Sequence, residues 1–331
     1  MHTTQEAALA RYAAQHKAQV DAYCARAVAE GRFDDAAGLA IAKQLSHVSR
    51  ELVKQQFPEL RFRDLIPPVA DNGSIAPGAA TYEWHYMEKV GEAEISASLG
   101  GTSNRVDVGI NGDPNVANLR HIRASYEIGD DELEAAALAG VALSMEKPML
   151  AREAIERKKD LIAFKGDSAH GLKGLLTDAN VPEVNSAAAF SAMSAADLYT
   201  WLIDHTDSIW VDSAQIFAAD TLILPPAQFK ILKAKRFSTA SDSSVLKLFL
   251  ESSQFIKSVD YSRHLIGASD TATDLALVYA KRPEVVGYIE SVLYMESAPT
   301  RNGFSTSVEG RGRFGGVAWR IPNAAKKIGD I

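Results

Sequence analysis

The sequence predicts an α+β protein, and three observations support this fold class. Apolar and small residues recur at helical spacing through residues 130–165, for example at Leu150, Ala154 and Leu161. Aromatic residues alternate with polar ones across residues 81–90, which is typical of a β-strand. After residue 195, short helical and strand-like stretches follow one another without a regular order, as in a mixed α+β domain.

The composition excludes several classes of protein. The chain has 331 residues, of which 47% are hydrophobic, so it is long enough for two or three compact units with a core. No apolar run reaches the roughly 18 residues of a membrane span, and no signal peptide is evident, so we expect a soluble protein made in the cytoplasm. The single cysteine, Cys24, excludes an intramolecular disulfide. A net charge of −7 argues against a nucleic-acid-binding protein with a basic face.

The first 80 residues divide into a helical part and an irregular part. Residues 6–30 and 36–56 predict two helices separated by Gly31, and their apolar stripes are thin. We therefore expect this region to need a partner surface. Residues 58–79 contain four prolines and two glycines, which predicts an extended connector rather than a helix.

A long hairpin is predicted next. Residues 81–90 and 104–110 form its two strands, and residues 99–103 form the loop between them. A ten-residue strand spans about 33 Å, and an isolated hairpin is only marginally stable in water. The aromatic face of Tyr82, Trp84 and Tyr86 therefore requires another surface, and no neighbouring stretch supplies an obvious one. Residues 119–128 predict a returning strand.

The helical region that follows matches the helix dipole. Carboxylates fill its first turn from Asp130 to Glu134, and cationic residues lie near its far end. Pro148 predicts a break or kink near Glu146, and Gly166 is expected to end the helix.

Charged residues on this helix are expected to face solvent. Lys158 and Lys159, together with Glu153 and Glu156, are typical of a solvated helix face that carries ion pairs three or four residues apart.

Beyond this helix the predicted elements are short. Helices are expected at residues 195–210, 227–235 and 244–251, and strands at residues 220–224, 274–280, 305–311 and 316–321.

No motif in the sequence supports catalysis or cofactor binding. Gly310, Gly312 and Gly315 have the spacing of a dinucleotide fingerprint, but only sixteen residues follow, too few for the βαβ unit that this motif requires. A glycine-lined turn or bulge is the preferred interpretation. The eight histidines lack the spacing of a metal site. We therefore predict no catalytic, cofactor-binding or metal-binding residues.

Ser168 is the one candidate nucleophile that merits comparison with a known pattern. Gly166-Asp167-Ser168 is similar to the nucleophile block of an esterase family, and His170 lies close by. A nucleophile elbow normally follows a strand, however, and Ser168 follows a predicted helix end. A capped helix end is the simpler interpretation.

The order of five sequence blocks indicates a family. From residue 58 onward the chain resembles the major capsid proteins of tailed bacteriophages with the Hong Kong 97 type fold. The matching blocks are PELRFRDLIPP at 58–68, TYEWHYMEKVGEAE at 81–94, AREAIERKKDLIAFKGDSAHGLKGLL at 151–176, DTLILPPAQFKIL at 220–232 and GRFGGVAWRIPNAA at 312–325.

The resemblance implies a division of the chain into parts. These are a helical N-terminal arm (1–66), an extended loop made of the β-hairpin (67–128), a peripheral domain with a long spine helix (129–184 with 302–331) and an axial domain (185–301). In that family the hairpin lies across a neighbouring subunit, which would bury its aromatic face. The candidate subunit-interface residues are Tyr82, Trp84, Tyr86, Arg105, Asp107, Arg120 and Arg123. Charge pairing of the three arginines with Asp107 and Glu127 is one way to set the register, and a solvated strand face is the alternative interpretation of these charges.

The resemblance also implies partners and a location. Copies of the chain would form the pentamers and hexamers of an icosahedral shell in the virion, assembled in the cytoplasm of the bacterial host. A portal, scaffold or decoration proteins, and packaged DNA bound without sequence specificity would be further partners. Two alternatives remain: an encapsulin-like nanocompartment shell, and an α+β serine hydrolase that uses Ser168.

Overall fold

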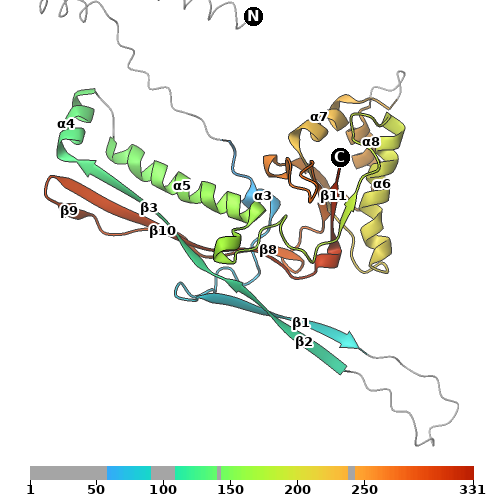
Figure 1. The fold of residues 1–331 in the computed structure, drawn as a ribbon, viewed down its shortest axis with the longest axis horizontal. Coiled ribbons are helices and arrows are strands. Elements are labelled where there is room, and N and C mark those ends of the chain that lie inside the picture. The colour runs from blue at the N-terminus through green and yellow to red at the C-terminus, as the bar shows by residue number, and fades with distance from the viewer. Residues whose placement is uncertain (1–57, 91–108, 140–142, 238–242) are drawn as a thin grey trace, which may run out of the picture. The chain divides into compact units, whose positions relative to one another are not determined.

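The computed structural model describes residues 58–90, 109–139, 143–237 and 243–331 (Figure 1). The helices are α3 (Phe62–Leu65), α4 (Asp130–Ala139), α5 (Leu143–Lys165), α6 (Ala195–Asp212), α7 (Pro226–Ala234) and α8 (Val245–Ser252). The strands are β1 (Thr81–Val90), β2 (Gly109–Asn118), β3 (Arg120–Gly129), β4 (Glu183–Asn185), β5 (Thr221–Leu224), β6 (Ser258–Tyr261), β7 (Ala276–Tyr279), β8 (Val286–Glu296), β9 (Thr300–Asn302), β10 (Ser305–Trp319) and β11 (Ala325–Gly329). None of the described helices is long and apolar enough to span a membrane.

The predicted hairpin exists, and its second strand extends further along the chain than expected. The prediction for residues 81–90 is confirmed by β1, which pairs with β2 from Thr81 opposite Asn118 to Val90 opposite Gly109. The prediction of a second strand at 104–110 is confirmed at residues 109 and 110, the part of it that is described, and β2 continues beyond the predicted end to Asn118. Pro114 is accommodated within β2 because, among the described strands, β2 pairs with β1 alone and leaves its other edge open. The predicted loop at 99–103 lies outside the described residues.

A first sheet is built around the long strand β10. β10 pairs antiparallel with β3 on one side and with β8 and β9 on the other. The prediction of a returning strand at 119–128 is confirmed by β3, whereas the two strands expected at 305–311 and 316–321 are one continuous strand. The register with β8 shifts three times between Arg311 and Val317, so the predicted glycine-associated bulge is confirmed.

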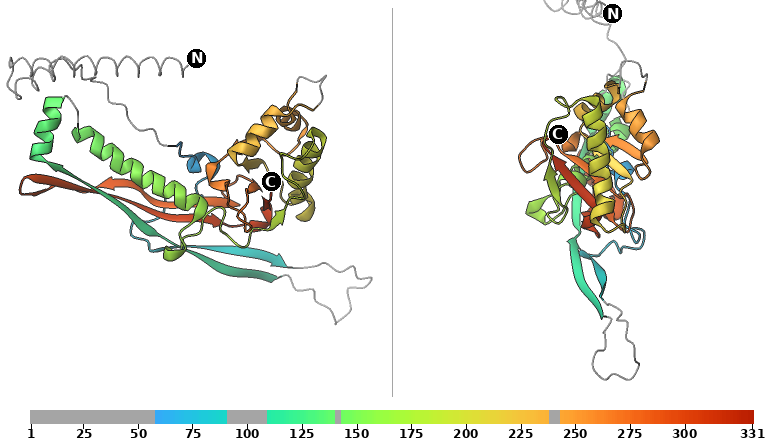
Figure 2. Two further views of the ribbon diagram at one scale, coloured as in Figure 1. Left: turned by 45° about the horizontal axis from the view of Figure 1, so that its top comes forward. Right: turned by 90° about the vertical axis from the view of Figure 1, so that its right-hand side faces the viewer.

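The long helix α5 packs along this sheet, against β3 and β10 (Figures 1 and 2). Ile155 and Ile162 are buried against the sheet. The close approach depends on Gly312 of β10, because a Cβ atom there would lie 3.0 Å from Lys159 Cε and 3.2 Å from Ile155 Cγ2. Gly312, one of the three glycines whose spacing suggested a nucleotide motif, thus serves helix–sheet packing.

The helical region differs from the prediction at its proline. The expected break near Glu146 is wrong, because α4 ends at Ala139 and α5 runs without interruption from Leu143 through Pro148. Pro148 lies in the second turn, where the missing N–H removes only one intrahelical hydrogen bond, and the packing of the later turns stabilises the helix. The predicted end at Gly166 is confirmed, since this residue has φ +66° and its N–H donates to Ile162 O at 2.8 Å.

A second, five-stranded sheet has the order β4-β11-β7-β5-β6 and carries α6, α7 and α8. Every residue of β5 and β7 is buried. Helix α6 begins with a capping box in which the Ser194 side chain accepts from the Asp197 N–H and the Asp197 side chain accepts from the Ser194 N–H. The helices and strands predicted between residues 195 and 280 are confirmed, with shifts of one or two residues at most of their ends.

The segment after residue 57 belongs to the core, which differs from the prediction of an arm or connector through residue 66. Residues 62–65 form the one-turn helix α3, and Phe62, Leu65 and Ile66 are buried. The Phe62 ring packs edge-on against Tyr288 and Phe314, at centroid distances of 5.5 and 5.9 Å. Residues 1–57, where the two helices were predicted, lie outside the described residues.

The two sheets do not follow the predicted domain boundaries. β8, in the range expected for the axial domain, pairs with β10 in the first sheet. β11, in the range expected for the peripheral domain, pairs with β7 and β4 in the second sheet. The chain therefore crosses between the two sheets three times: between β3 and β4, near residues 280–286, and after Trp319.

Candidate functional site

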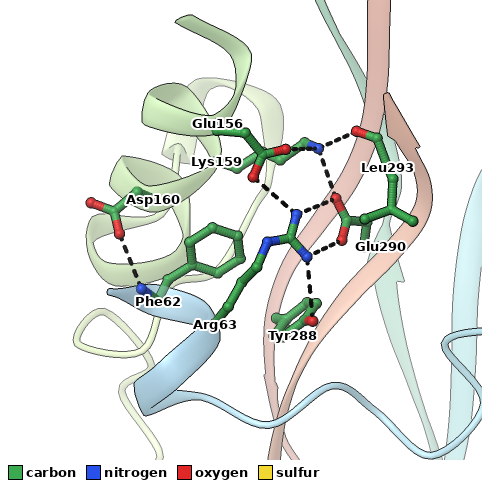
Figure 3. Close-up of polar contacts among 8 residues, drawn as sticks. All are labelled: Phe62, Arg63, Glu156, Lys159, Asp160, Tyr288, Glu290 and Leu293. Atoms are coloured by element: carbon green, nitrogen blue, oxygen red, sulfur yellow. Dashed lines mark hydrogen bonds and ion pairs between the residues drawn. The ribbon is translucent and has the colours of Figure 1, made fainter. Parts of the chain in front are cut away.

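A buried ion network joins three elements that are distant in the sequence (Figure 3). Arg63 of α3 binds both carboxylate oxygens of Glu290 on β8, at 2.8 and 3.1 Å, and Glu156 of α5 at 2.9 Å. Lys159 of α5 donates to Glu156 at 2.8 Å, to Glu290 at 2.7 Å and to Leu293 O. The network therefore ties α3, α5 and β8 to one another.

The charges of this network balance. Because the network is largely shielded from water, each charged side chain is stabilised mainly by the opposite charges of its neighbours. Two cations, Arg63 and Lys159, face two carboxylates, Glu156 and Glu290, and the side chain of Lys159 is 0% exposed. Burial opposes the charge of Arg63, but hydrogen bonds and attraction from Glu290 and Glu156 outweigh burial and raise the pKa of Arg63. Burial alone would raise the pKa of Glu156, but Lys159 and Arg63 lower it below its usual value.

A second buried group, centred on Asp160, holds the same segment. Its carboxylate accepts the Phe62 N–H at 3.2 Å and contacts His264 Nε2 at 2.7 Å. The His264 ring stacks on Phe164 at 4.7 Å. Two residues of α5 one turn apart, Glu156 and Asp160, thus hold Arg63 and Phe62 respectively.

The sequence reasoning missed this site. The prediction of a solvated face is confirmed for Lys158, which is exposed, and is wrong for Lys159. The missed signal was Glu290, a lone carboxylate within an apolar strand. A carboxylate buried in such a strand requires a cationic partner.

The root of the β1–β2 hairpin rests on its own chain. Tyr82 and Trp84 are half-buried, stack at a centroid distance of 5.9 Å and pack against a small cluster that includes Val69 and Leu119. The Tyr82 hydroxyl donates to Asp71 at 3.3 Å and accepts from Arg320 at 2.5 Å. Burial is the main cause that raises the pKa of Tyr82. The expectation that no local surface covers these aromatic residues is therefore wrong.

Of the other predicted interface residues, the two whose side chains are described, Arg120 and Arg123, do not lie in one patch. Tyr86 lies opposite Asp113 in the hairpin, and only its backbone is described, while Arg105 and Asp107 lie outside the described residues. Arg120 and Arg123 are three positions apart on β3 and therefore point to opposite faces.

The two arginines of β3 have different surroundings. Arg120 donates to His170 O at 3.3 Å, on the side of α5. Arg123 lies on the other face, where Glu127 is four positions along the strand, about 13 Å away, and accepts from Ser305 instead. No ion pair joins Arg123 to Glu127 among the described residues of one copy, and charge pairing between copies stays a prediction.

The Ser168 region has the geometry of a helix end. Asp167 Oδ1 and His170 Nδ1 are 3.1 Å apart, and the hydrogen bond from His170 lowers the pKa of Asp167. Within the described part of the chain, Ser168 Oγ makes no hydrogen bond with either residue. In the same part, no group of three or more His, Cys, Asp or Glu residues could hold a metal ion.

The fold is similar to those of solved phage capsid structures. The capsid of Myoviridae phage XM1 matches with a TM-score of 0.76 and 18% identity, over 88% of this chain and 98% of that one. The capsid of the native GTA particle matches with a TM-score of 0.61 and 12% identity, over 88% and 97%. A structure from Mycobacterium phage Ogopogo matches with a TM-score of 0.58 and 12% identity, over 88% and 99%.

Sequence comparison gives the family. No curated protein matches the chain. The family model described as "Major capsid protein" matches residues 91–331, which is more than two thirds of the chain. The fold agrees with this match, since the described residues form the mixed helix-and-sheet architecture of the phage capsid structures. The chain belongs to the major capsid protein family.

Proposed function

We propose that copies of this chain assemble through pentamers and hexamers into an icosahedral shell that encloses the double-stranded DNA of a tailed phage or prophage. The observation that carries this proposal is the family match together with a fold that covers 98% of the XM1 capsid chain. The GTA capsid structure, described with C5 symmetry, is consistent with fivefold rings in a related shell. Head-to-tail contacts between unlike surfaces generate such closed rings.

Each part of the fold has a proposed place in this shell. The first sheet with α5 would form the peripheral domain, with α5 as its spine helix. The five-stranded sheet with α6, α7 and α8 would form the axial domain at the centre of each capsomer. Residues 1–57 would form the N-terminal arm. The boundaries of this proposal follow strand pairing, so β8 goes with the peripheral domain and β11 with the axial domain.

The β1–β2 hairpin would be the extended loop that reaches a neighbouring copy. Its strands pair only with each other over ten residues, and a lone hairpin is marginally stable in water. Tyr82 and Trp84 would fix its root on their own subunit, while the part beyond Tyr86, with Arg105 and Asp107, would contact the neighbour. Arg120 and Arg123 would contact neighbours from opposite faces of the first sheet.

Further partners are proposed on the basis of the family. A portal, scaffold or decoration proteins, and packaged DNA held without sequence-specific contacts would complete the particle. The shell would assemble in the host cytoplasm and act as a structural protein rather than an enzyme. Ser168→Ala would then leave assembly unchanged.

The test is the mass and shape of the purified full-length chain, measured by light scattering and negative-stain electron microscopy. The proposal expects rings of five or six subunits, or closed shells. A monodisperse monomer across a wide concentration range would contradict it.

A further inference from the structure

The helices that cover the five-stranded sheet carry charges of opposite sign. No lysine or arginine occurs in the sequence between Lys173 and Lys230, a stretch that includes all of α6, and α6 itself carries four aspartates. Residues 225–241, which include α7, carry four lysines and arginines and no acidic residue. Charge is therefore segregated between α6 and α7 before any pairing is considered.

One side of α6 presents two carboxylates without a cationic partner. Asp204 is exposed, Asp207 is half-buried, and the two lie on the same side of the helix because they are three residues apart. Neither forms an ion pair in the part of the chain that the structure describes, and Lys326 of β11 pairs with Asp212 instead, at 3.5 Å. Val211, one turn beyond Asp207, is 64% exposed. Asp204, Asp207 and Val211 form what we call the acidic face.

The outer side of α7 presents two lysines with the same spacing. Lys230 and Lys233 are both exposed, and neither forms an ion pair among the described residues. Two carboxylates lie near this helix. Asp260 of β6 pairs with Arg61 at 3.0 Å, and Glu59 lines a hollow with the first residue of α7, so the two lysines keep an excess of positive charge. Lys230 and Lys233 form what we call the basic face.

The two faces lie toward opposite ends of the five-stranded sheet. α6 lies beside β11, where Lys326 donates to Ser208 at 3.0 Å. α7 packs against β6, where the rings of Phe229 and Tyr261 are 5.4 Å apart. In the strand order β4-β11-β7-β5-β6, three strand spacings separate β11 from β6, which is about 14 Å at about 4.8 Å per spacing. That distance exceeds the screening length of about 8 Å at physiological salt.

The segment after α7 returns to α6, but not to the acidic face. Phe237 contacts Tyr199 of α6 at a centroid distance of 5.8 Å. Asp204 and Asp207 are five and eight residues further along the helix, about 8 and 12 Å at 1.5 Å per residue. Lys235 donates to backbone oxygens of the segment before α6. The acidic and basic faces are therefore not neutralised by each other within one copy.

We propose that the acidic face of one copy docks on the basic face of the next copy around each capsomer, with Asp204 and Asp207 paired to Lys230 and Lys233. The proposal rests on the shell function proposed above and assigns residues to one of its subunit contacts. Because the two faces lie toward opposite ends of one layer, every copy uses both, and such head-to-tail contacts close into a ring. Val211 packs against the apolar stems of the lysines, whose ammonium groups stay near water.

Charge reversal in the full-length chain tests the proposal. D204K/D207K makes both faces basic, K230E/K233E makes both faces acidic, and the fourfold variant reverses both faces and keeps them complementary. D131K/E134K is the matched control, since Asp131 and Glu134 of α4 are also exposed, three residues apart and without an ion pair in the described part of the chain. Circular dichroism and thermal unfolding establish that each variant is folded, and light scattering with negative-stain electron microscopy measures assembly.

Each two-residue reversal should raise the concentration needed for assembly by about tenfold or more, because like charges then meet at the contact. The fourfold variant should recover most of this loss, and D131K/E134K should assemble like the wild type. The difference between the wild type and the two reversals should shrink at 1 M salt, where the screening length falls to about 3 Å.

An equimolar mixture of D204K/D207K and K230E/K233E gives the sharpest result. A copy with two basic faces fits only between copies with two acidic faces, so the two variants have to alternate around a ring. Alternation closes in a ring of six subunits and not in a ring of five. The mixture should therefore form sixfold rings and lack fivefold ones, whereas the fourfold variant should form both.

Wild-type assembly by either two-residue reversal would overturn the contact. The same conclusion follows if the fourfold variant, or the mixture, assembles no better than the separate reversals. These results reject the contact alone, because the wild-type chain still forms rings or shells. If the wild-type chain itself does not assemble, the proposed function fails and the contact fails with it.

Discussion

Glu290→Gln is the sharpest perturbation of the buried ion network. The change removes one of the two negative charges that balance Arg63 and Lys159, and Lys159 has no access to solvent. Breaking a buried pair by removing one partner costs about 3–5 kcal/mol, and glutamine retains some hydrogen bonding, so we expect the lower end of that range. A loss of about 3 kcal/mol at about 2–4 °C per kcal/mol corresponds to a fall in Tm of about 6–12 °C.

The assay is urea and thermal unfolding of the unassembled subunit, so that subunit contacts do not contribute. Glu153→Gln is the control, because Glu153 lies on the same helix but pairs with Arg157 only at 3.9 Å at the surface, and such a pair contributes about 0.3–0.5 kcal/mol. Adding Lys159→Met to Glu290→Gln restores charge balance and should recover part of the loss. Equal stability of Glu290→Gln and Glu153→Gln would refute the argument that the network holds α3, α5 and β8 together.

Three further predictions follow from the same contacts. The pKa of Glu156 in the folded protein is lowered below its usual value of 4.5. The stability that the Glu156 carboxylate contributes is therefore complete above pH 4.5 and is lost as the pH falls through the lower folded-state pKa. For this reason, the urea midpoint of Glu156→Gln should fall less between about pH 7 and about pH 4 than that of the wild type. Gly312→Val should lower the free energy of unfolding by about 1–3 kcal/mol, because the added side chain would contact Lys159. Gly78→Ala should leave the free energy of unfolding unchanged, because no atom lies within 4 Å of the added Cβ. Tyr82→Phe removes the hydroxyl that accepts from Arg320 and should lower stability by about 1–2 kcal/mol and speed hydrogen exchange at the hairpin root; unchanged exchange would contradict this.

Local patterns were the part of the fold that the sequence could predict. The alternation of Tyr82 and Trp84 with polar residues identified β1, and the apolar run before Pro225 identified β5. Gly166 identified the end of α5, because a left-handed residue there suits glycine. These signals depend on residues that are close together in the chain.

Long-range pairing was the part that could not be predicted. Whether Lys159 is buried depends on Arg63 and Glu290, which lie 96 and 131 positions away in the sequence. The charged residues of α5 show the same pattern whether Lys159 is buried or exposed. Sheet membership has the same cause, since β8 and β11 each pair with a strand that the sequence assigned to the other domain. In the candidate interface, the period of two along β3 separates Arg120 from Arg123, although the sequence places them together.

The most direct test of the central claim is a cryo-electron microscopy reconstruction of particles formed by the full-length chain. The account predicts a closed shell with fivefold and sixfold capsomers, in which the five-stranded sheets surround the capsomer axes and the hairpin of one copy lies on its neighbour. A chain that stays monomeric at every concentration, or particles whose subunits contact through surfaces unrelated to the hairpin and the first sheet, would contradict it.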